Sequence, residues 1–161
     1  MGRVLALKYR PKKFRDLIGQ ESVSQTLSSS LLGGKLSHAY LFSGLRGSGK
    51  TSTARIFAKA LVCENRVADE PCGVCSGCVA AEEGRHIDII EMDAASNRKI
   101  EDVRALIEST KYKPSQSLYK VFIIDEVHML TKEAFNALLK TLEEPPAYVK
   151  FILATTDPMK L

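Results

Sequence analysis

The sequence predicts an α/β domain built on a mostly parallel sheet. Strand-like and helix-like segments alternate along the 161 residues, which is the pattern of repeated strand–helix–strand units. The run Val121–Ile124 is apolar throughout, as expected of a strand that helices cover on both faces. A glycine-rich loop separates one predicted strand from the helix after it. We expect right-handed crossovers between the strands.

Four elements are predicted in the first part of the chain. A helix is expected over 21–34, with Val23, Leu27 and Leu31 as its apolar stripe and two glycines at its end. The apolar segment 39–42 is predicted to be a strand. A helix over 50–62 and a strand over 87–92 follow. One face of that helix carries residues at the i, i+3, i+4 and i+7 positions, namely Ala54, Phe57, Ala58 and Leu61.

The second part of the chain continues the alternation. We expect a helix over 99–110, a strand over 121–124, a helix over 131–143 that Pro145 and Pro146 stop, and a strand over 151–154. The apolar positions of the first helix are Ile100, Val103 and Ile107, and those of the second are Phe135, Leu138, Leu139 and Leu142.

Composition and charge narrow the class of protein. Apolar residues make up 45% and charged residues 26% of the chain, which is ordinary for a globular domain and excludes a disordered or collagenous one. No apolar run approaches the ~20 residues of a spanning helix, and the N-terminus lacks the apolar core of a secretion signal. We therefore expect a cytosolic protein with no membrane partner. The net charge of +4 is a weak indication of a nucleic-acid partner.

All four cysteines lie within one short segment, as Cys63, Cys72, Cys75 and Cys78. Cytosolic thiols stay reduced, so two disulfides are not expected. Four thiolates at this spacing fit one tetrahedral Zn²⁺, with Gly73 and Gly77 permitting tight turns between them. Such a closed site leaves no position for substrate, so we expect a structural role. Buried structural cysteines or a redox pair are the alternatives.

A phosphate-binding loop is the clearest chemical motif. Residues 44–51 read Gly-Leu-Arg-Gly-Ser-Gly-Lys-Thr, and they lie between a predicted strand and a predicted helix, as the motif requires. Backbone N–H groups and the helix N-terminus would surround the β-phosphate. Lys50 would reach the β- and γ-phosphates, and the Thr51 hydroxyl would bind Mg²⁺. The expected nucleotide contacts are Gly44, Leu45, Arg46, Gly47, Ser48, Gly49, Lys50, Thr51 and Ser52.

Two acidic residues complete the predicted hydrolytic site. Asp125 and Glu126 follow the apolar run 121–124, which brings them to the carboxyl end of a central strand, beside the phosphate loop. Asp125 is expected to hold Mg²⁺ and Glu126 to activate the water that attacks the γ-phosphate. The alternative is a solvated strand end. The chain has no guanine-reading Asn/Thr-Lys-x-Asp motif, which favours ATP.

Over its whole length the sequence resembles the clamp-loader ATPases of the bacterial DNA polymerase III gamma/tau type. The resemblance rests on the phosphate loop, the cysteine segment and several further stretches: Lys8–Phe14, Asp16–Gln20, His38–Gly44, Pro71–Cys75, Asp93–Ser96, Ile124–Leu130, Phe135–Pro146 and Leu153–Pro158. It implies a three-layer AAA+ fold of the P-loop type with a small inserted zinc module at about 63–78. It also implies a replication motor of the bacterial cytoplasm that uses ATP, Mg²⁺ and Zn²⁺.

The resemblance assigns further residues. Leu7, Arg10 and Ile18 would pack around the adenine, and Thr156, or its neighbour Thr155, would sense the γ-phosphate. Arg98 and Lys99 would contact primer–template DNA, an exposed charged face being the alternative. Partners would be the delta, delta-prime and other gamma/tau subunits and the sliding clamp. His38, His86 and His128 are expected to be packing or surface residues.

The resemblance also implies that parts of the ATPase lie beyond residue 161. The arginine that reaches a neighbour's ATP, the lid and the collar would all follow this segment, so we expect a piece of a longer protein, a complete small domain being the alternative. A trans arginine is worth roughly 10³–10⁵-fold in related systems, so the isolated chain is expected to hydrolyse ATP very slowly. The competing functions are a non-hydrolysing, delta-prime-like scaffold and another AAA+ DNA-remodelling ATPase.

Overall fold

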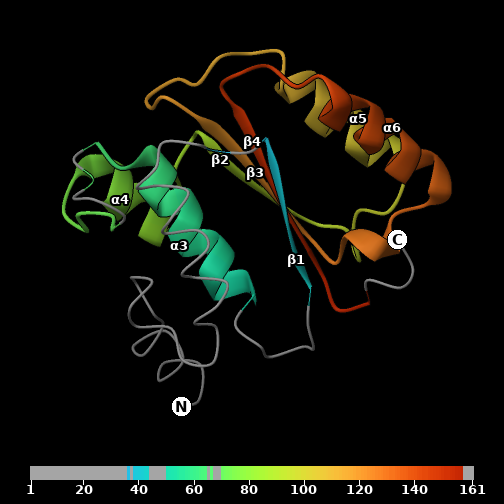
Figure 1. Ribbon diagram of the computed structural model, residues 1–161, viewed down its shortest axis with the longest axis horizontal. Helices are drawn as coiled ribbons and strands as arrows, with labels where there is room; N and C mark the ends of the chain where they lie inside the picture. Colours follow the sequence, from blue (N-terminus) through green and yellow to red (C-terminus); the bar gives the residue numbers. More distant parts are fainter. Residues whose placement is uncertain (1–35, 37, 44–49, 65, 67–69, 158–161) are drawn as a thin grey trace.

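A computed structural model describes residues 36, 38–43, 50–64, 66 and 70–157 (Figure 1). In chain order the elements are β1 (Ala39–Ser43), α3 (Lys50–Val62), α4 (Ser76–Glu82), β2 (Ile89–Asp93), α5 (Ile100–Ser109), β3 (Lys120–Asp125), the 3₁₀ turn η2 (Val127–Met129), α6 (Lys132–Glu143) and β4 (Val149–Thr155). The helix predicted over 21–34 lies outside the described residues. None of the described helices has the length and apolarity needed to cross a bilayer.

The four strands form one parallel sheet in the order β1-β4-β3-β2. Helices α3 and α4 cover one face and α5 and α6 the other, which gives three layers (Figure 1). The register pairs Ser43 with Thr155 and Asp93 with Asp125. The carboxyl ends of neighbouring strands therefore meet at one edge of the sheet, where a parallel α/β fold places its ligands. The predicted parallel α/β architecture is confirmed.

Helix α3 is buried on nearly all sides, which the predicted single apolar face does not explain. Ala54, Phe57, Ala58 and Leu61 are buried as predicted, but from 53 to 62 Arg55 alone is exposed. The additional burial of α3 comes from α4, which packs against it. The sequence patterns did not predict this helix in the cysteine segment. The Lys59 ammonium pairs with Glu82 of α4 at 2.8 Å between Nζ and Oε1. One face of α3 thus packs on the sheet and another on the cysteine module.

The apolar residues predicted to be buried in α5 and α6 are partly wrong. In α5, Val103 and Leu106 are the buried residues, and Ile100 and Ile107 are only half-buried. In α6 the most buried positions are Ala134 and Leu138, whereas Leu139 is 41% exposed. Because Leu138 faces the sheet, its neighbour Leu139 is turned about 100° away around the helix. A leucine pair in sequence cannot place both side chains in a core of this width.

The strand predicted over 87–92 begins two residues later, because Asp88 anchors a loop. Its buried carboxylate accepts backbone N–H groups from Ser115, Gln116 and Ser117 at 2.7–2.9 Å, and also the Ser117 hydroxyl. The preceding residue, Ile87, is exposed. Asp88 thereby fixes the connection between α5 and β3. Burial raises the pKa of Asp88, but these hydrogen bonds outweigh burial, and the net pKa lies below its ordinary value.

Replacing Asp88 by Asn is expected to destabilise the domain in a pH-dependent way. In the Asn side chain one carboxylate oxygen is replaced by an NH₂ group, which cannot accept from the backbone N–H groups that Asp88 binds. Losing one such hydrogen bond to a charged group costs about 2–3 kcal/mol of folding free energy. The wild-type contribution is complete above the unfolded pKa of about 3.9 and is lost as the pH falls through the lower folded pKa. Urea unfolding should therefore show a gap between wild type and Asp88→Asn at pH 7 that narrows below about pH 4. The exposed Glu144→Gln should change stability by less than about 0.5 kcal/mol, and an equal gap at both pH values would contradict this role for Asp88.

Candidate functional site

The acidic pair lies at the carboxyl end of β3. Asp125 is the last residue of the strand, and Glu126 begins the turn that leads into η2. Glu126 has a left-handed backbone, with φ 55° and ψ 46°, and it is the only such residue other than glycine in the described part of the chain. Its N–H donates to Asp125 Oδ1 at 3.0 Å. A backbone of this kind costs on the order of 1 kcal/mol and is found often at functional sites.

Two adjacent threonines at the end of β4 face different partners. The Thr156 hydroxyl donates to Glu126 Oε2 at 2.9 Å. Thr155 is fully buried, and its Oγ1 lies 2.7 Å from His128 Nδ1 and accepts the N–H of Asp157 at 3.0 Å. The ends of β3 and β4 are therefore joined through side chains as well as through the sheet. Of the two threonines proposed from the resemblance, Thr156 is the one in contact with the acidic pair.

His128 belongs to this cluster, and the sequence interpretation of it as a packing or surface residue was incomplete. Its side chain is 7% exposed, and Nε2 lies 3.8 Å from Glu126 Oε2. The short turn η2 returns the chain toward β4 and carries His128 with it. The signal available in the sequence was its position two residues after Glu126. His86, by contrast, is a packing residue as expected, since its Nδ1 accepts the N–H of Asp88 at 3.0 Å.

The phosphate loop, residues 44–49, lies outside the described residues, as do Leu7, Arg10 and Ile18. Lys50, Thr51 and Ser52 form the first turn of α3, and only their backbone is described. The loop joins the end of β1 to the start of α3. The last residue of β1 pairs with Thr155, so one end of the loop begins next to the strand end that carries the Glu126 contact.

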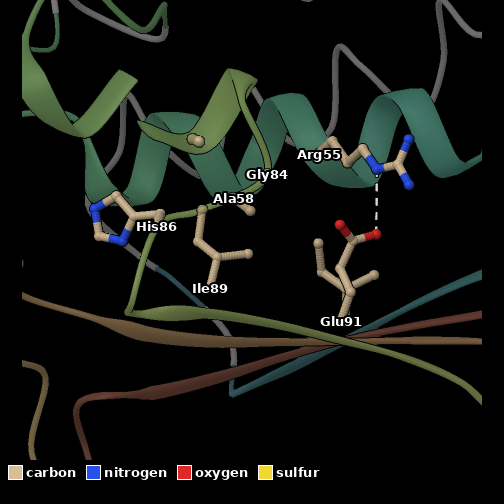
Figure 2. A pocket seen from close by; sticks show the side chains of 8 residues that line it. Arg55, Ala58, Gly84, His86, Ile89 and Glu91 are labelled. Carbon is tan, nitrogen blue, oxygen red and sulfur yellow. Dashed lines mark hydrogen bonds and ion pairs between the residues drawn. The ribbon is translucent and has the colours of Figure 1, made fainter. Parts of the chain in front are cut away.

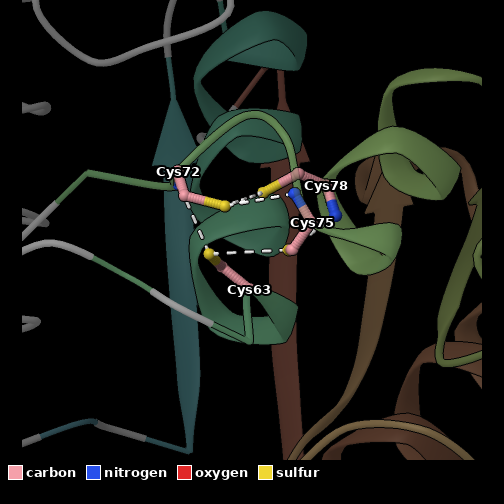
Figure 3. Close-up of side chains that lie close together, drawn as sticks. All are labelled: Cys63, Cys72, Cys75 and Cys78. Carbon is pink, nitrogen blue, oxygen red and sulfur yellow. Dashed lines mark hydrogen bonds between the residues drawn. The ribbon is translucent and has the colours of Figure 1, made fainter.

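The four cysteines converge on one point beside the C-terminus of α3 (Figure 3). All four sulfur atoms lie within 4.8 Å of one another, with 3.9 Å between Cys63 and Cys75 and 4.0 Å between Cys72 and Cys78. Those separations are far beyond a disulfide bond of about 2.05 Å. Four sulfurs placed tetrahedrally about 2.3 Å from a zinc ion would be about 3.8 Å apart. The donor set and its spacing therefore fit Zn²⁺.

Backbone donors surround the sulfur cluster. The N–H groups of Cys72, Cys75 and Cys78 each donate to a neighbouring sulfur at 3.2–3.3 Å. Burial raises the pKa of Cys75, but the N–H groups of Cys78 and Glu64 outweigh burial and lower that pKa to about 6. Burial keeps the pKa of Cys78 above its ordinary value, and the neighbouring sulfurs add to the effect. A cation is needed before all four sulfurs can be thiolates together.

The two glycines of the cysteine segment have different roles. Gly73 has φ +81°, which confirms that it permits the turn between Cys72 and Cys75. Gly77 does not lie in a tight turn, contrary to the prediction, but in α4. A Cβ atom there would meet the Val62 carbonyl oxygen at 2.7 Å. Gly77 therefore allows α4 to approach the C-terminus of α3 closely.

Arg98 and Lys99 are exposed immediately before α5, on the connection that follows β2. Arg98 Nε donates to the Met129 carbonyl oxygen at 3.0 Å, and the N–H of Thr131 donates to the Arg98 carbonyl oxygen at 2.9 Å. These bonds tie the connection after β2 to η2, which starts next to Glu126. The predicted DNA contact of the two side chains stays a prediction.

A separate cavity of about 200 Å³ lies among α3, the chain after α4 and β2 (Figure 2). Arg55 Nε and Glu91 Oε1 pair at 3.1 Å along its wall, and both side chains are about 40% exposed. Its described lining contains neither the acidic pair nor the cysteines. The cavity therefore contributes no residue to the site at the carboxyl ends of the strands.

The comparisons with known proteins agree with these features. The family described as DNA polymerase III, delta subunit, matches residues 19–161. The chain is 57% identical to the DNA polymerase III subunit tau of Salmonella typhimurium and 58% identical to the subunit tau/gamma of Haemophilus influenzae, each over 99% of the chain. It is 56% identical to the subunit tau of Bacillus subtilis over 95% of the chain. The chain spans about a quarter of the length of these relatives, 25%, 23% and 27% respectively.

Solved structures share the fold. A DNA polymerase III gamma subunit-related protein of Thermotoga maritima matches with a TM-score of 0.56 and 22% identity, over 89% of this chain and 41% of that one. The RuvB Holliday junction branch migration motor of the same organism matches with a TM-score of 0.59 and 25% identity, over 95% and 44% of the two chains. The predicted α/β fold of the AAA+ type is confirmed.

Proposed function

Because the chain belongs to the family described as DNA polymerase III, delta subunit, and is 56–58% identical to several tau and gamma subunits, we propose that it is the ATP-binding and ATP-hydrolysing domain of a sliding-clamp loader of the gamma/tau type. The observation that carries the hydrolytic part is the Thr156–Glu126 hydrogen bond across the ends of β4 and β3, next to the strand that leads into the phosphate-loop motif.

In the proposed reaction each residue has one task. Lys50 and the backbone of the phosphate loop bind the phosphates and offset the negative charge that develops on the transferred group. Glu126 accepts a proton from the attacking water, and Thr156 orients the carboxylate that does so. Thr51 and Asp125 are the residues that would hold Mg²⁺, which would supply charge neutralisation at the β- and γ-phosphates. Leu7, Arg10 and Ile18 are proposed to pack around the adenine.

The cysteine module is proposed to hold one structural Zn²⁺ through Cys63, Cys72, Cys75 and Cys78. Their sulfur spacing is what four thiolates around one zinc require. The closed ligand set leaves no position for a reacting water. The module, about residues 63–78, would act as a folded layer on α3 within a single nucleotide-binding domain.

The partners of the whole protein are proposed from the same family membership. We expect further gamma/tau copies, the delta and delta-prime subunits, the sliding clamp and primer–template DNA, in the bacterial cytoplasm at the replisome. Arg98 and Lys99 support the DNA proposal because both are exposed and directly precede the N-terminus of α5, where phosphate groups are bound favourably.

A second candidate is a clamp-loader subunit that does not hydrolyse ATP. The matching family description names the delta subunit, and a scaffold would keep the fold and the zinc module. Against it stand the complete phosphate-loop motif of residues 44–51 and the polar contacts that hold Glu126. Hydrolysis in the assembled complex separates the two candidates.

The proposal is tested first by nucleotide binding. Changing Lys50 to Ala is expected to raise the ATP Kd by at least about 30-fold, because losing one partner of a close charge pair costs about 2–5 kcal/mol. The matched control is Lys113→Ala, an exposed lysine in the connection after α5, which should leave the Kd unchanged. Fluorescent-ATP titration of the full-length subunit measures both. Equal binding by wild type and Lys50→Ala would refute the nucleotide site, and tight binding without hydrolysis in the complex would favour the scaffold.

A further inference from the structure

We propose that His128 is a positioning residue for Glu126, acting as a neutral imidazole that is oriented by Thr155 and directs its Nε2–H at the Glu126 carboxylate. The inference rests on the proposed ATPase function. Its basis is a chain of side-chain contacts that runs from β4 through η2 to the end of β3. The chain comprises Thr155 Oγ1 to His128 Nδ1 at 2.7 Å and His128 Nε2 to Glu126 Oε2 at 3.8 Å.

The hydrogen-bond roles follow from the hydroxyl group of Thr155. Its oxygen already accepts the N–H of Asp157 at 3.0 Å, and its single hydrogen needs an acceptor because the residue is fully buried. At 2.7 Å, His128 Nδ1 provides that acceptor. A neutral imidazole whose Nδ1 accepts carries its hydrogen on Nε2. The nitrogen that faces Glu126 is then a donor.

Thr156 and His128 both face the same oxygen of Glu126, the first through a hydrogen bond and the second at a longer distance. The Thr156 hydroxyl donates to Glu126 Oε2 at 2.9 Å, and the Nε2–H of His128 approaches Oε2 from the turn η2. At 3.8 Å His128 Nε2 lies beyond hydrogen-bond distance and acts on Oε2 electrostatically. The Thr156 hydrogen bond and this contact both favour Oε2 as the held oxygen, which leaves Oε1 to take a proton from water. The carboxylate is thereby restricted to one orientation, which matters because misplacement by about 1 Å can cost 10²-fold in rate.

The burial of His128 supports positioning over surface exposure. Its side chain is 7% exposed, against 21% for Glu126, so its orientation is set by the protein and not by solvent. His128 also lies in the 3₁₀ turn η2. This turn starts directly after Glu126, whose backbone is left-handed. A short turn of this kind fixes the relative placement of the two side chains with few rotatable bonds between them.

The test uses His128→Ala and His128→Gln in the full-length subunit assembled with its partner subunits. Ala removes the donor, and we expect kcat for ATP hydrolysis to fall about tenfold while KM changes less than about twofold. Gln places an amide N–H close to the position of Nε2, and we expect it to restore kcat to within about threefold of wild type. His38→Ala, at an exposed histidine outside the cluster, is the matched control and should keep wild-type kcat.

A second measurement separates this inference from the proposed function. In a Glu126→Gln background, adding His128→Ala should change the residual rate by less than about twofold, because His128 acts through the carboxylate that is already gone. An unchanged kcat in His128→Ala, equal losses in Ala and Gln, or a full additional loss in the Glu126→Gln background would overturn the inference. If the wild-type complex hydrolyses no ATP, the proposed function fails instead, and if Glu126→Gln hydrolyses ATP at the wild-type rate, the proposed role of Glu126 as the base fails. Thermal unfolding of each variant identifies a loss that is due to misfolding.

Discussion

Replacing Glu126 by Gln is expected to lower the rate of ATP hydrolysis by about 10²–10⁴-fold, the usual contribution of a positioned general base. The amide keeps the size of the side chain and can still contact Thr156, but it cannot accept the proton of the attacking water. The ATP Kd should change by less than about threefold, because the phosphate loop and Lys50 provide the binding in the proposed site. The measurements are steady-state hydrolysis by the assembled complex and nucleotide titration of the subunit.

The control for this prediction is Glu143→Gln, which removes an exposed carboxylate at the end of α6 and should leave kcat unchanged. A parallel loss of ATP binding in Glu126→Gln would mean that the residue supports the nucleotide site and does not activate water. Hydrolysis at the wild-type rate would exclude Glu126 as the base. Only a selective loss of kcat agrees with the geometry at the ends of β3 and β4.

Removing zinc is the second change with a large expected effect. Cys78 is fully buried and Cys75 is 9% exposed, so without a cation the cluster leaves either buried charge or buried unpaired thiols. Cys78→Ser is expected to reduce bound zinc from one ion per chain to nearly none. We expect it to destabilise the domain by at least about 3 kcal/mol, which lowers the Tm by on the order of 6–12 °C for a domain of this size.

The matched control is Ser76→Ala, one residue after Cys75, where the hydroxyl donates to Glu64 at 2.8 Å on the exposed side of the module. It should keep full zinc content and a Tm close to wild type. Metal analysis and thermal unfolding with and without a chelator measure both variants. If the chelator has no effect and a reductant lowers the Tm, the cysteines form disulfides, and the zinc assignment is wrong.

The predictable part of the fold came from patterns that depend on local sequence. The apolar runs gave β1, β3 and β4 to within two residues. For the central strands β3 and β4 the reason is that helices cover both faces, and such a strand needs mostly apolar side chains. The start of β2 was misplaced because Asp88 anchors a loop whose donors come from residues 115–117, far along the chain. Helix α4 was missed because its single cysteine, Cys78, and its small residues do not form an apolar helical stripe.

The functional residues also divide into those that local sequence predicts and those that depend on contacts between distant segments. Asp125 and Glu126 were recognisable from their place after an apolar strand, and the cysteines from their spacing. The contact of His128 with Thr155 joins residues that are 27 positions apart. It depends on β4 lying next to β3 and on the path of the turn after Glu126. No periodicity in the sequence reports such a contact, so the sequence predicts no more than a packing or surface residue at position 128.

The double burial of α3 has a mechanical consequence. The helix is 13 residues long, or about 20 Å, and it connects the phosphate loop directly to the first cysteine, Cys63. With the sheet on one side and α4 on another, it has little freedom to bend or slide, because close-packed interiors transmit displacement and do not absorb it. A force applied at the phosphate loop would be transmitted along the axis of α3 to the cysteine module. Any elastic compliance of this domain must then reside outside α3, in the connections between its elements.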